Sequence, residues 1–408
     1  TLNRSTAERL IKGMRCASRM ERLQDKALLN AMELTETEDM ISFSAGFPSP
    51  ETYPVEAIKE SFVKVLEREG KEALSYCSTS GYGKLRELLA QRMRDKFGLD
   101  YKTEEVVITS GSQQALDMSS MLFINKGDIV LFETPSYLGA VNALRAYEAE
   151  LCGLPTDRNG LVMDALKQAL DRYGERVKMI YVIPDFQNPT GRSWSAERRK
   201  EFIEFISDYD IPVIEDAAYS ELSFEDRLEK PLAWYDRKGQ VVYVGTFSKI
   251  FCPGLRVAWL CAREDLMEKY LLLKNAADLS SSAIAQRQMA YYLEHNDLDT
   301  HIRRITGLYK ERRDRMMIAI DREFPKEVHY EVPRGGLFIW LELPEGKDSR
   351  ELLRRALAEK VAFIPGGSFY PSGVKNNELR LNFSNMALED IDKGMAILGR
   401  LTKEYLAE

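Results

Sequence analysis

The segment Thr246-Phe247-Ser248-Lys249-Ile250-Phe251-Cys252-Pro253-Gly254-Leu255-Arg256 decides how this chain is interpreted. It follows an apolar run, Val241 to Val244, which is typical of a buried strand. The segment places one lysine beside small hydroxyl residues, with an arginine seven positions further on. Partial burial and nearby cationic charge both favour the neutral form of a lysine amine. Lys249 is therefore a candidate for forming a Schiff base with a carbonyl compound.

The neighbours of Lys249 indicate which carbonyl compound would fit. Hydroxyl groups and a guanidinium are ordinary anchors for a phosphate. A phosphate-bearing aldehyde would therefore suit this segment. Pyridoxal 5′-phosphate (PLP) is such an aldehyde, and we predict that it is the cofactor.

Composition restricts the classes of partner. The chain has 408 residues, enough for two domains and a large core. Its formal net charge is −7, so it has no basic field to attract nucleic acid or anionic lipid. No run approaches 18 uninterrupted apolar residues, which argues against a membrane span. We expect neither nucleic acid nor a membrane as a partner.

Cysteine and histidine usage restricts the chemistry. The five cysteines form no CxxC pair, which argues against a disulfide framework or a zinc site and favours a reducing cytoplasm. The basic, partly apolar first twenty residues lack a cleavage signal and are interpreted as a surface helix leading into the fold. The three histidines, His295, His301 and His329, all lie late in the chain. Ser-His-Asp hydrolysis and most metal chemistry are therefore excluded, and no metal is expected.

The middle of the chain alternates between strand-like and helical patterns. The strand-like runs are 105–109, 129–133, 178–183, 211–215, 241–245 and 256–261. The helical patterns are 112–124, 136–147, 163–172 and 195–208. This alternation predicts an α/β domain with a mainly parallel sheet, whose ligands bind at the carboxyl ends of its strands.

The two ends of the chain have a different character. A helix is predicted from Thr6 to Leu34, followed by the breaker-rich stretch Phe43 to Pro50. After about 290 come helices at 299–324, 349–359 and 387–406 and short strands near 328–333, 336–344, 361–366 and 378–384, which predict a smaller α+β domain. We expect an N-terminal arm and helix (1–55) packing with the small domain, a large domain (56–290) and a small C-terminal domain (291–408).

A carboxylate ends one of the predicted strands, in Glu215-Asp216-Ala217-Ala218-Tyr219. A buried carboxylate needs a cationic partner to stay charged, and a protonated pyridine nitrogen would be one. The retained positive charge makes such a ring an electron sink. Tyr219 could then reach the phenolic oxygen of the ring. The alternative is that Asp216 caps a helix and Tyr219 only packs.

Three further motifs have both a functional and a structural interpretation. Ser110-Gly111-Ser112-Gln113-Gln114 opens a predicted helix and suits an anion, although Ser112 could be a plain N-cap. Phe186-Gln187-Asn188-Pro189-Thr190-Gly191 offers an amide donor at a pocket rim, or only a turn, and its Asn-Pro bond can be cis. Arg380, in an alternating strand, suits a carboxylate, or is a solvated edge arginine.

Together these motifs resemble the fold-type I PLP-dependent aminotransferases of class I/II over nearly the whole chain. The resemblance is nearest to the branch of 2-aminoadipate, aromatic and branched-chain aminotransferases. The matching motifs are FSAGFPSPETYP, LSYCSTSGYGKLRE, TSGSQQALD, ETPSYLGA, FQNPTG, EDAAYSEL, GTFSKIFCPGLRVAW, VPRGGLFIWLELP, VAFIPGGSF and NELRLNFS. The resemblance implies an aspartate aminotransferase-like fold, with a mainly parallel seven-stranded sheet flanked by helices.

The resemblance also implies roles for individual residues. Lys249 matches the lysine that bonds the cofactor and moves the proton of the substrate Cα. Asp216 matches the partner of the pyridine nitrogen, and Asn188 and Tyr219 match the donors to the phenolic oxygen. These four are the predicted catalytic residues.

The remaining predicted contacts lie around the cofactor and the substrate. Tyr137 would stack on one ring face and Ala218 on the other. The phosphate cup would consist of Ser112, Gln113, Ser248 and Arg256. Arg380 would bind the substrate α-carboxylate, with Gly46 and Asn188 lining the substrate pocket. Tyr76 would reach the phosphate from a neighbouring subunit, which implies a homodimer with shared active sites.

The implied reaction moves the amino group of an L-amino acid to a 2-oxo acid such as 2-oxoglutarate by a ping-pong mechanism. Members of the branch that read acidic side chains carry an arginine in an N-terminal helix, where this chain has Leu29 in Lys26 to Asn30. The apolar Leu29 favours a neutral or aromatic donor, unless Arg15, Arg19 or Arg22 takes that place. The resemblance to the branch also implies a 2-aminoadipate-like donor as an expectation.

Two other functions share this fold. A Cβ–S lyase would use the same cofactor and break a different bond. Some bacterial transcription regulators carry an aminotransferase-like sensor domain behind a basic winged-helix module. Only some 40 residues precede FSAGFP and the overall charge is acidic, which disfavours the regulator.

Overall fold

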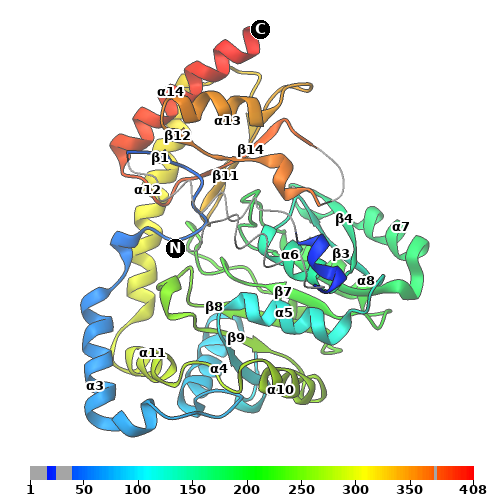
Figure 1. The fold of residues 1–408 in the computed structure, drawn as a ribbon, viewed down its shortest axis with the longest axis vertical. Helices are drawn as coiled ribbons and strands as arrows, with labels where there is room; N and C mark the ends of the chain where they lie inside the picture. Colours follow the sequence, from blue (N-terminus) through cyan, green and yellow to red (C-terminus); the bar gives the residue numbers. More distant parts are fainter. Residues whose placement is uncertain (1–15, 24–38, 372–374) are drawn as a thin grey trace.

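A computed structural model describes residues 16–23, 39–371 and 375–408 (Figure 1). The polypeptide forms a large sheet covered on both faces by helices and a small antiparallel sheet backed by helices on one side. None of the helices in the described part of the chain is long and apolar enough to cross a membrane.

The large sheet contains eight strands in the order β2-β9-β8-β7-β6-β3-β4-β5. They are β2 (Val106–Thr109), β3 (Ile129–Thr134), β4 (Glu150–Asp157), β5 (Gly160–Leu161), β6 (Val177–Val182), β7 (Val213–Asp216), β8 (Val241–Thr246) and β9 (Ala258–Cys261). The pairs from β4 through β8 are parallel, whereas β9 is antiparallel to both its neighbours, and β5 is antiparallel to β4. The mainly parallel sheet is confirmed. It has eight strands where seven were expected, because the two-residue β5 adds a strand at the edge.

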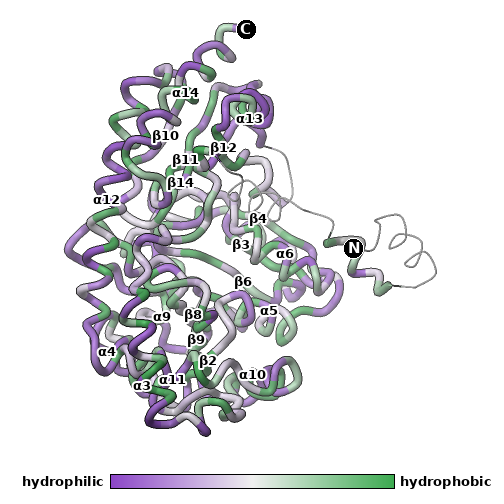
Figure 2. Tube along the Cα trace, turned by 60° about the vertical axis from the view of Figure 1, so that its left-hand side comes forward, coloured by the Kyte–Doolittle hydropathy of each residue, from purple (hydrophilic) through white to green (hydrophobic). Residues whose placement is uncertain are grey.

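The central strands β3, β6, β7 and β8 are almost entirely buried because helices cover both sides of the sheet. The helices are α3 (Val55–Ala73), α4 (Gly83–Phe97), α5 (Ser112–Phe123), α6 (Leu138–Ala146), α7 (Met163–Tyr173), α8 (Ala196–Ile206), α9 (Leu232–Tyr235), α10 (Glu264–Asp278) and α11 (Ala283–His295). Side chains of α7 and α8 pack on one face with Leu131 and Ile180, and those of α4, α5 and α11 pack on the other with Phe132 and Tyr181. In Figure 2 the outer helices alternate between hydrophobic and hydrophilic residues, as expected for helices with one face on the sheet.

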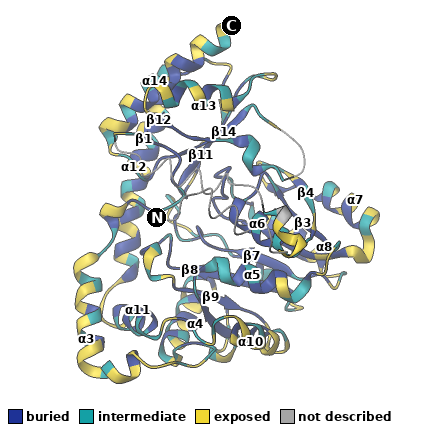
Figure 3. Cartoon of the chain, viewed as in Figure 1, coloured by how far each residue is buried: buried dark blue, intermediate teal, exposed yellow. Residues whose placement is uncertain are grey.

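The small sheet has the order β10-β11-β14-β13, with every pair antiparallel. Its strands are β10 (His329–Tyr330), β11 (Phe338–Glu342), β13 (Ile364–Pro365) and β14 (Glu378–Asn382), and a separate parallel pair joins β1 (Ile41–Ser42) to β12 (Val361–Ala362). The helices are α12 (Leu298–Glu323), α13 (Ser349–Ala358) and α14 (Leu388–Ala407). Both core strands, β11 and β14, are buried (Figure 3).

Short 3₁₀ helices connect these elements. They are η1 (Ser18–Arg22), η2 (Pro50–Thr52), η3 (Thr103–Glu105), η4 (Gly174–Arg176), η5 (Pro253–Leu255) and η6 (Gly366–Phe369). Most of the helix predicted from Thr6 to Leu34 lies outside the described residues, as does Leu29.

Candidate active site

The candidate site lies where the carboxyl ends of the parallel strands face the small sheet. β7 ends at Asp216, β8 leads through Thr246 to Lys249, and the loop after β6 carries Asn188. From the small sheet, β14 contributes Arg380, which pairs in register with Trp340 and Ile364. The strand-end rule therefore brings together polar residues that are far apart in the sequence.

Lys249 is partly buried at the centre of this arrangement. Its Nζ donates a hydrogen bond of 2.7 Å to the carbonyl of Gly46 and lies 5.9 Å from the centre of the Tyr219 ring. Burial lowers the pKa of this amine to about 8, although the negative charge of Asp216 opposes the shift, and Arg380 reinforces it. A substantial fraction of the amine is therefore neutral near physiological pH.

Asp216 is a buried carboxylate with two donors on the protein side. Tyr181 donates from its hydroxyl to Oδ2 at 2.8 Å, and the backbone N–H of Ala218 donates to Oδ1 at 3.3 Å. Burial raises the pKa of Asp216, while these two hydrogen bonds and the charge of Lys249 act in the opposite direction. A cationic partner inside the site would keep this carboxylate ionised.

Asn188 connects the two halves of the site. Its Nδ2 donates to the Tyr219 hydroxyl at 3.5 Å, and its Oδ1 accepts from Nη1 of Arg380 at 2.8 Å. The peptide bond from Asn188 to Pro189 is cis, as the sequence allows. One amide side chain therefore orients both the phenol and the guanidinium.

Arg380 is only 5% exposed. Its Nη2 donates to the carbonyl of Ser44 at 2.7 Å, and its guanidinium lies 4.4 Å from the centre of the Phe338 ring and 5.2 Å from that of Phe369. Its Nε is buried and has no hydrogen-bond partner among the described residues. Burial lowers the pKa of this guanidinium to about 10, so it remains charged at neutral pH and can take an anion.

A cradle for an anion forms where α5 begins beside Arg256. Gly111, with φ of 81°, precedes this helix, and a Cβ at this position would collide with the guanidinium of Arg256. Arg256 also donates to Ser248 Oγ at 3.4 Å, and the Ser248 backbone is fixed by Thr246. The first N–H groups of an α-helix lack partners within the helix, so the start of α5 at Ser112 adds donors to the cradle.

Tyr137 and Gln113 complete the wall on the side of α6. Tyr137 directly precedes this helix, and its ring lies so close to Gly139 that no Cβ could fit there. Gln113 donates from Nε2 to the carbonyl of Gly139 at 2.8 Å. Burial raises the pKa of Tyr137 to about 12, and the charges of Asp216, Arg256 and Arg380 also act on it. Tyr137 therefore stays neutral in the site.

Tyr76 was predicted to contact the cofactor phosphate, but within a single chain it is not part of the candidate site. Its side chain is 87% exposed in the loop between α3 and α4. In the same loop, Thr79 contacts Asn275 in the last turn of α10, and Cys77 contacts Ser281 just after that helix. Leu272 and Leu279 lie near the same end of α10, and their side chains are also exposed.

Several contributors to the site carry no recognisable sequence signal. The carbonyls of Ser44 and Ala45 bind Arg380, and a backbone oxygen cannot be identified from residue type. The aromatic residues at 338 and 369 that flank the guanidinium have the pattern of ordinary core residues. Tyr181 has the pattern of a strand former, and its hydroxyl contact with Asp216 depends on strand register.

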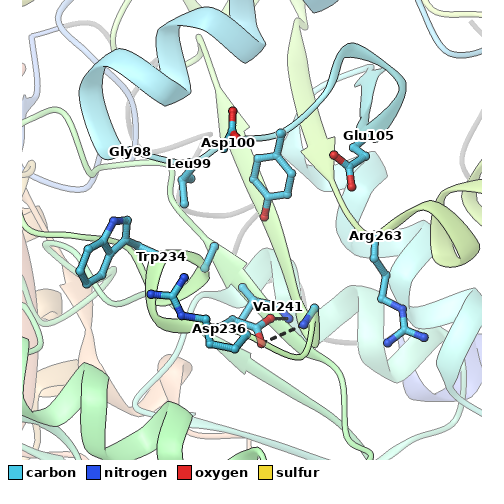
Figure 4. Close-up of a pocket in the computed structure, with 12 residues that line it drawn as sticks. Gly98, Leu99, Asp100, Glu105, Trp234, Asp236, Val241 and Arg263 are labelled. Atoms are coloured by element: carbon cyan, nitrogen blue, oxygen red, sulfur yellow. Dashed lines mark hydrogen bonds between the residues drawn. The ribbon is translucent and has the colours of Figure 1, made fainter.

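A separate cavity of about 290 Å³ lies at the amino-terminal ends of strands β2 and β8 of the large sheet (Figure 4). It is lined by Tyr101 and Glu105 before β2, by Trp234, and by Val241 at the start of β8. The carboxylate of Asp236, which also lines the cavity, already accepts three backbone N–H groups. Val241 begins β8, whereas the candidate site lies beyond the carboxyl end of that strand, so this cavity is remote from the candidate site.

The residues present at the main site fit PLP. The amine of Lys249 suits its aldehyde, Asp216 suits its ring nitrogen, and the cradle of Arg256, Ser248 and the start of α5 suits its phosphate. The orphaned Nε of Arg380 leaves a donor for the carboxylate of a second molecule.

Comparison with known proteins agrees with this geometry. Residues 38–398 match the family described as aminotransferase class I and II. The chain is 40% identical to the aromatic-amino-acid aminotransferase 1 of Thermococcus litoralis, over 92% of this chain and 91% of that protein. It is 37% identical to the multiple substrate aminotransferase of Thermococcus profundus, with a TM-score of 0.91 over 96% of this chain and 98% of that chain.

A second similar structure contains a cofactor derivative. The α-aminoadipate aminotransferase LysN from Thermus thermophilus was solved in complex with N-(5′-phosphopyridoxyl)-L-leucine. It is 36% identical, with a TM-score of 0.89, and the alignment covers 100% of both chains.

Proposed function

The chain belongs to the class I and II aminotransferases and uses PLP, and from this premise we propose which residues perform the reaction and on which substrates. The proposed reaction takes the amino group from a neutral, aromatic or 2-aminoadipate-like L-amino acid. A 2-oxo acid such as 2-oxoglutarate then accepts it at the same site. The observation that carries this proposal is the bridge by Asn188, which orients Tyr219 and Arg380 around the amine of Lys249.

Arg380 binds and orients the α-carboxylate of either substrate. Its buried position excludes water from the ion pair, and its flanking aromatic rings restrict the plane of the guanidinium. A bidentate contact then fixes the substrate Cα relative to Lys249. Asn188 keeps the guanidinium in place before the substrate arrives.

Lys249 acts as the general base and acid. Its Nζ would take the proton from the substrate Cα and hold it until it is returned, and its lowered pKa suits both directions near neutral pH. When bound, PLP supplies the aldehyde that accepts the amino group and the ring that withdraws electrons from Cα. Asp216 would pair with the ring nitrogen, and Tyr219 and Asn188 would donate to the phenolic oxygen.

The remaining residues hold the cofactor. Ser112, Gln113, Ser248 and Arg256 would bind the phosphate, and Tyr137 and Ala218 would contact the two ring faces. Gly46, whose carbonyl accepts from Lys249, lies on the substrate side. We also propose that the chain consists of an N-terminal arm and helix (1–55), a large domain (56–290) and a small C-terminal domain (291–408).

The substrate range is tested with a panel of L-amino acids and 2-oxoglutarate. We expect glutamate to form with aromatic and branched-chain donors, because Leu29 replaces the arginine that reads acidic side chains in relatives of this branch, and the panel includes 2-aminoadipate to test whether an acidic donor is accepted. Omitting the acceptor is the control. Continuous release of ammonia and pyruvate from a sulfur-containing donor without an acceptor would instead support a Cβ–S lyase, and absence of glutamate with every donor would contradict the proposal.

Covalent attachment of PLP to the cofactor-free protein is expected to accelerate as the pH rises through about 8. Only the neutral amine attacks an aldehyde, so below that pKa the rate should rise about tenfold per pH unit and then level off. Stopped-flow absorbance between about pH 6.5 and about pH 9.5 measures it, with Nα-acetyl-lysine as the control, because its only amine has a pKa of about 10.4 and its rate keeps rising. A protein profile that rises in parallel with that of Nα-acetyl-lysine would contradict an amine with a lowered pKa.

We propose that a homodimer completes each site, with Tyr76 of one protomer donating to the phosphate bound by its partner. The support is its 87% exposure in a loop that contacts the end of α10, where Leu272 and Leu279 are also exposed. Tyr76→Phe should weaken cofactor binding about 10- to 150-fold, the loss expected for a hydrogen bond to a charged group.

Mixed dimers test whether Tyr76 acts across the interface. Co-refolding Tyr76→Phe with a Lys249→Ala variant should restore tight cofactor binding at one site of each hybrid, because the Lys249→Ala protomer supplies an intact Tyr76. Equilibrium titration of the isolated hybrid measures it. A hybrid that binds as weakly as the Tyr76→Phe homodimer would place Tyr76 outside the partner's site.

A further inference from the structure

Tyr181 is a buried side chain that the proposed reaction does not use directly. It lies on β6, where it pairs in register with Phe132 of β3 and Ile214 of β7. Alternate residues of a strand share a face, so Tyr181 lies on the same face as Ile214 and Asp216. The side chain is 2% exposed.

The hydroxyl of Tyr181 reaches along the sheet to the strand end. It donates to Oδ2 of Asp216 at 2.8 Å. The backbone N–H of Ala218 holds Oδ1 at 3.3 Å. Each carboxylate oxygen therefore has one donor from the sheet side, which fixes the plane of the carboxylate.

The electrostatic setting makes this hydrogen bond important. Burial raises the pKa of Asp216, and donation by Tyr181 is the largest of the effects that lower it. Lys249, Tyr137 and Tyr219 are the other titratable groups whose charges interact with this carboxylate. Of these three, the amine of Lys249 lowers the pKa of Asp216, and the two phenols have raised pKa values and stay neutral.

We propose that Tyr181 is a positioning residue, whose hydroxyl keeps the Asp216 carboxylate charged and aimed at the ring nitrogen of the cofactor. The inference rests on the proposed pairing of Asp216 with that nitrogen. A carboxylate that accepts a hydrogen bond is the weaker base of the pair, so the shared proton stays on the nitrogen. Without the hydroxyl, the carboxylate becomes more basic and the proton moves from the nitrogen to Asp216.

The test compares Tyr181→Phe with Tyr243→Phe in the holoenzyme. Each variant removes one hydroxyl from a tyrosine that is 2% exposed, and Tyr243 lies on β8 in the same core. Tyr181→Phe should move the ¹⁵N resonance of ring-labelled PLP toward the value of neutral pyridine. It should also slow the half-reaction with an amino acid about 10- to 150-fold, the equivalent of a hydrogen bond to a charged group.

Tyr243→Phe should leave both measurements at the wild-type value, and thermal unfolding should confirm that both variants fold. Equal ¹⁵N shifts in wild type and Tyr181→Phe would overturn the role of Tyr181. An Asp216→Asn variant separates the two hypotheses. If Asp216→Asn also leaves the ¹⁵N resonance unchanged, the pairing of Asp216 with the ring nitrogen fails. If only Tyr181→Phe is silent, that pairing stands and the inference about Tyr181 is wrong.

Discussion

Replacing Lys249 with alanine is expected to slow transamination by at least about 10²- to 10⁴-fold, the contribution of a positioned general base. The variant loses both the amine that bonds the cofactor and the group that moves the Cα proton. No other described lysine contacts Asp216 or Gly46 in this site, so no side chain is placed to substitute. The loss should appear in the single-turnover rate of the half-reaction.

Borohydride reduction gives an independent readout of the same residue. In wild type it should fix the cofactor to Lys249, where mass spectrometry of peptides locates it. In Lys249→Ala the cofactor should remain removable by gel filtration. Methylamine, which is small enough to replace the truncated amine, should restore part of the single-turnover rate, because the cradle at Arg256 and the contacts of Asp216 remain.

Near-normal turnover of Lys249→Ala, or a borohydride adduct on a different lysine, would remove Lys249 from the mechanism. Lys274→Ala is a suitable control. Lys274 is also a buried lysine, but its Nζ is bonded to Asp278 and Ser281 on the side of α10. Its loss should affect stability more than the covalent attachment of cofactor.

The polar motifs that follow the strands predicted most residues of the candidate site, because each motif can be identified within a few residues of sequence. An apolar run precedes Asp216, Lys249 and the loop that carries Asn188. Parallel strands bring the residues that follow them to the same end of the sheet. β4 was not predicted, because Glu150–Asp157 contains Gly153 and Pro155 and has exposed residues, so it lacks both alternation and an apolar run. Its place near the sheet edge explains how it forms despite this composition.

Contacts across the fold could not be predicted in the same way. The antiparallel direction of β9 depends on the short connection through η5, which carries Arg256 back toward α5. The bond from Tyr181 to Asp216 requires the register of β6 against β7. Arg380 was predicted from its residue type, but its ordering by Asn188 and by a backbone carbonyl required tertiary structure.

Replacing Arg380 with alanine is expected to cost about 2–5 kcal/mol of transition-state binding, the range for truncating one partner of a buried charge pair. This corresponds to about a 30- to 5,000-fold fall in kcat/KM. Both half-reactions should be affected, because the amino acid and the 2-oxo acid present the same carboxylate. Arg380→Lys keeps the charge but loses the planar fork, so it should recover only part of the activity.

The control for Arg380 is a substrate without the carboxylate. A simple primary amine that reacts slowly with the holoenzyme should react at the same rate with wild type and Arg380→Ala, because its only contacts are at the amine. Folding of the variant needs checking by thermal unfolding, since Arg380 also binds Asn188 and Ser44. Equal losses for the amine and the amino acid would show that Arg380 acts only through Asn188, whereas an unchanged kcat/KM for the amino acid would place the carboxylate site elsewhere. Selective loss with carboxylate substrates is the result that the buried, unpaired Nε predicts.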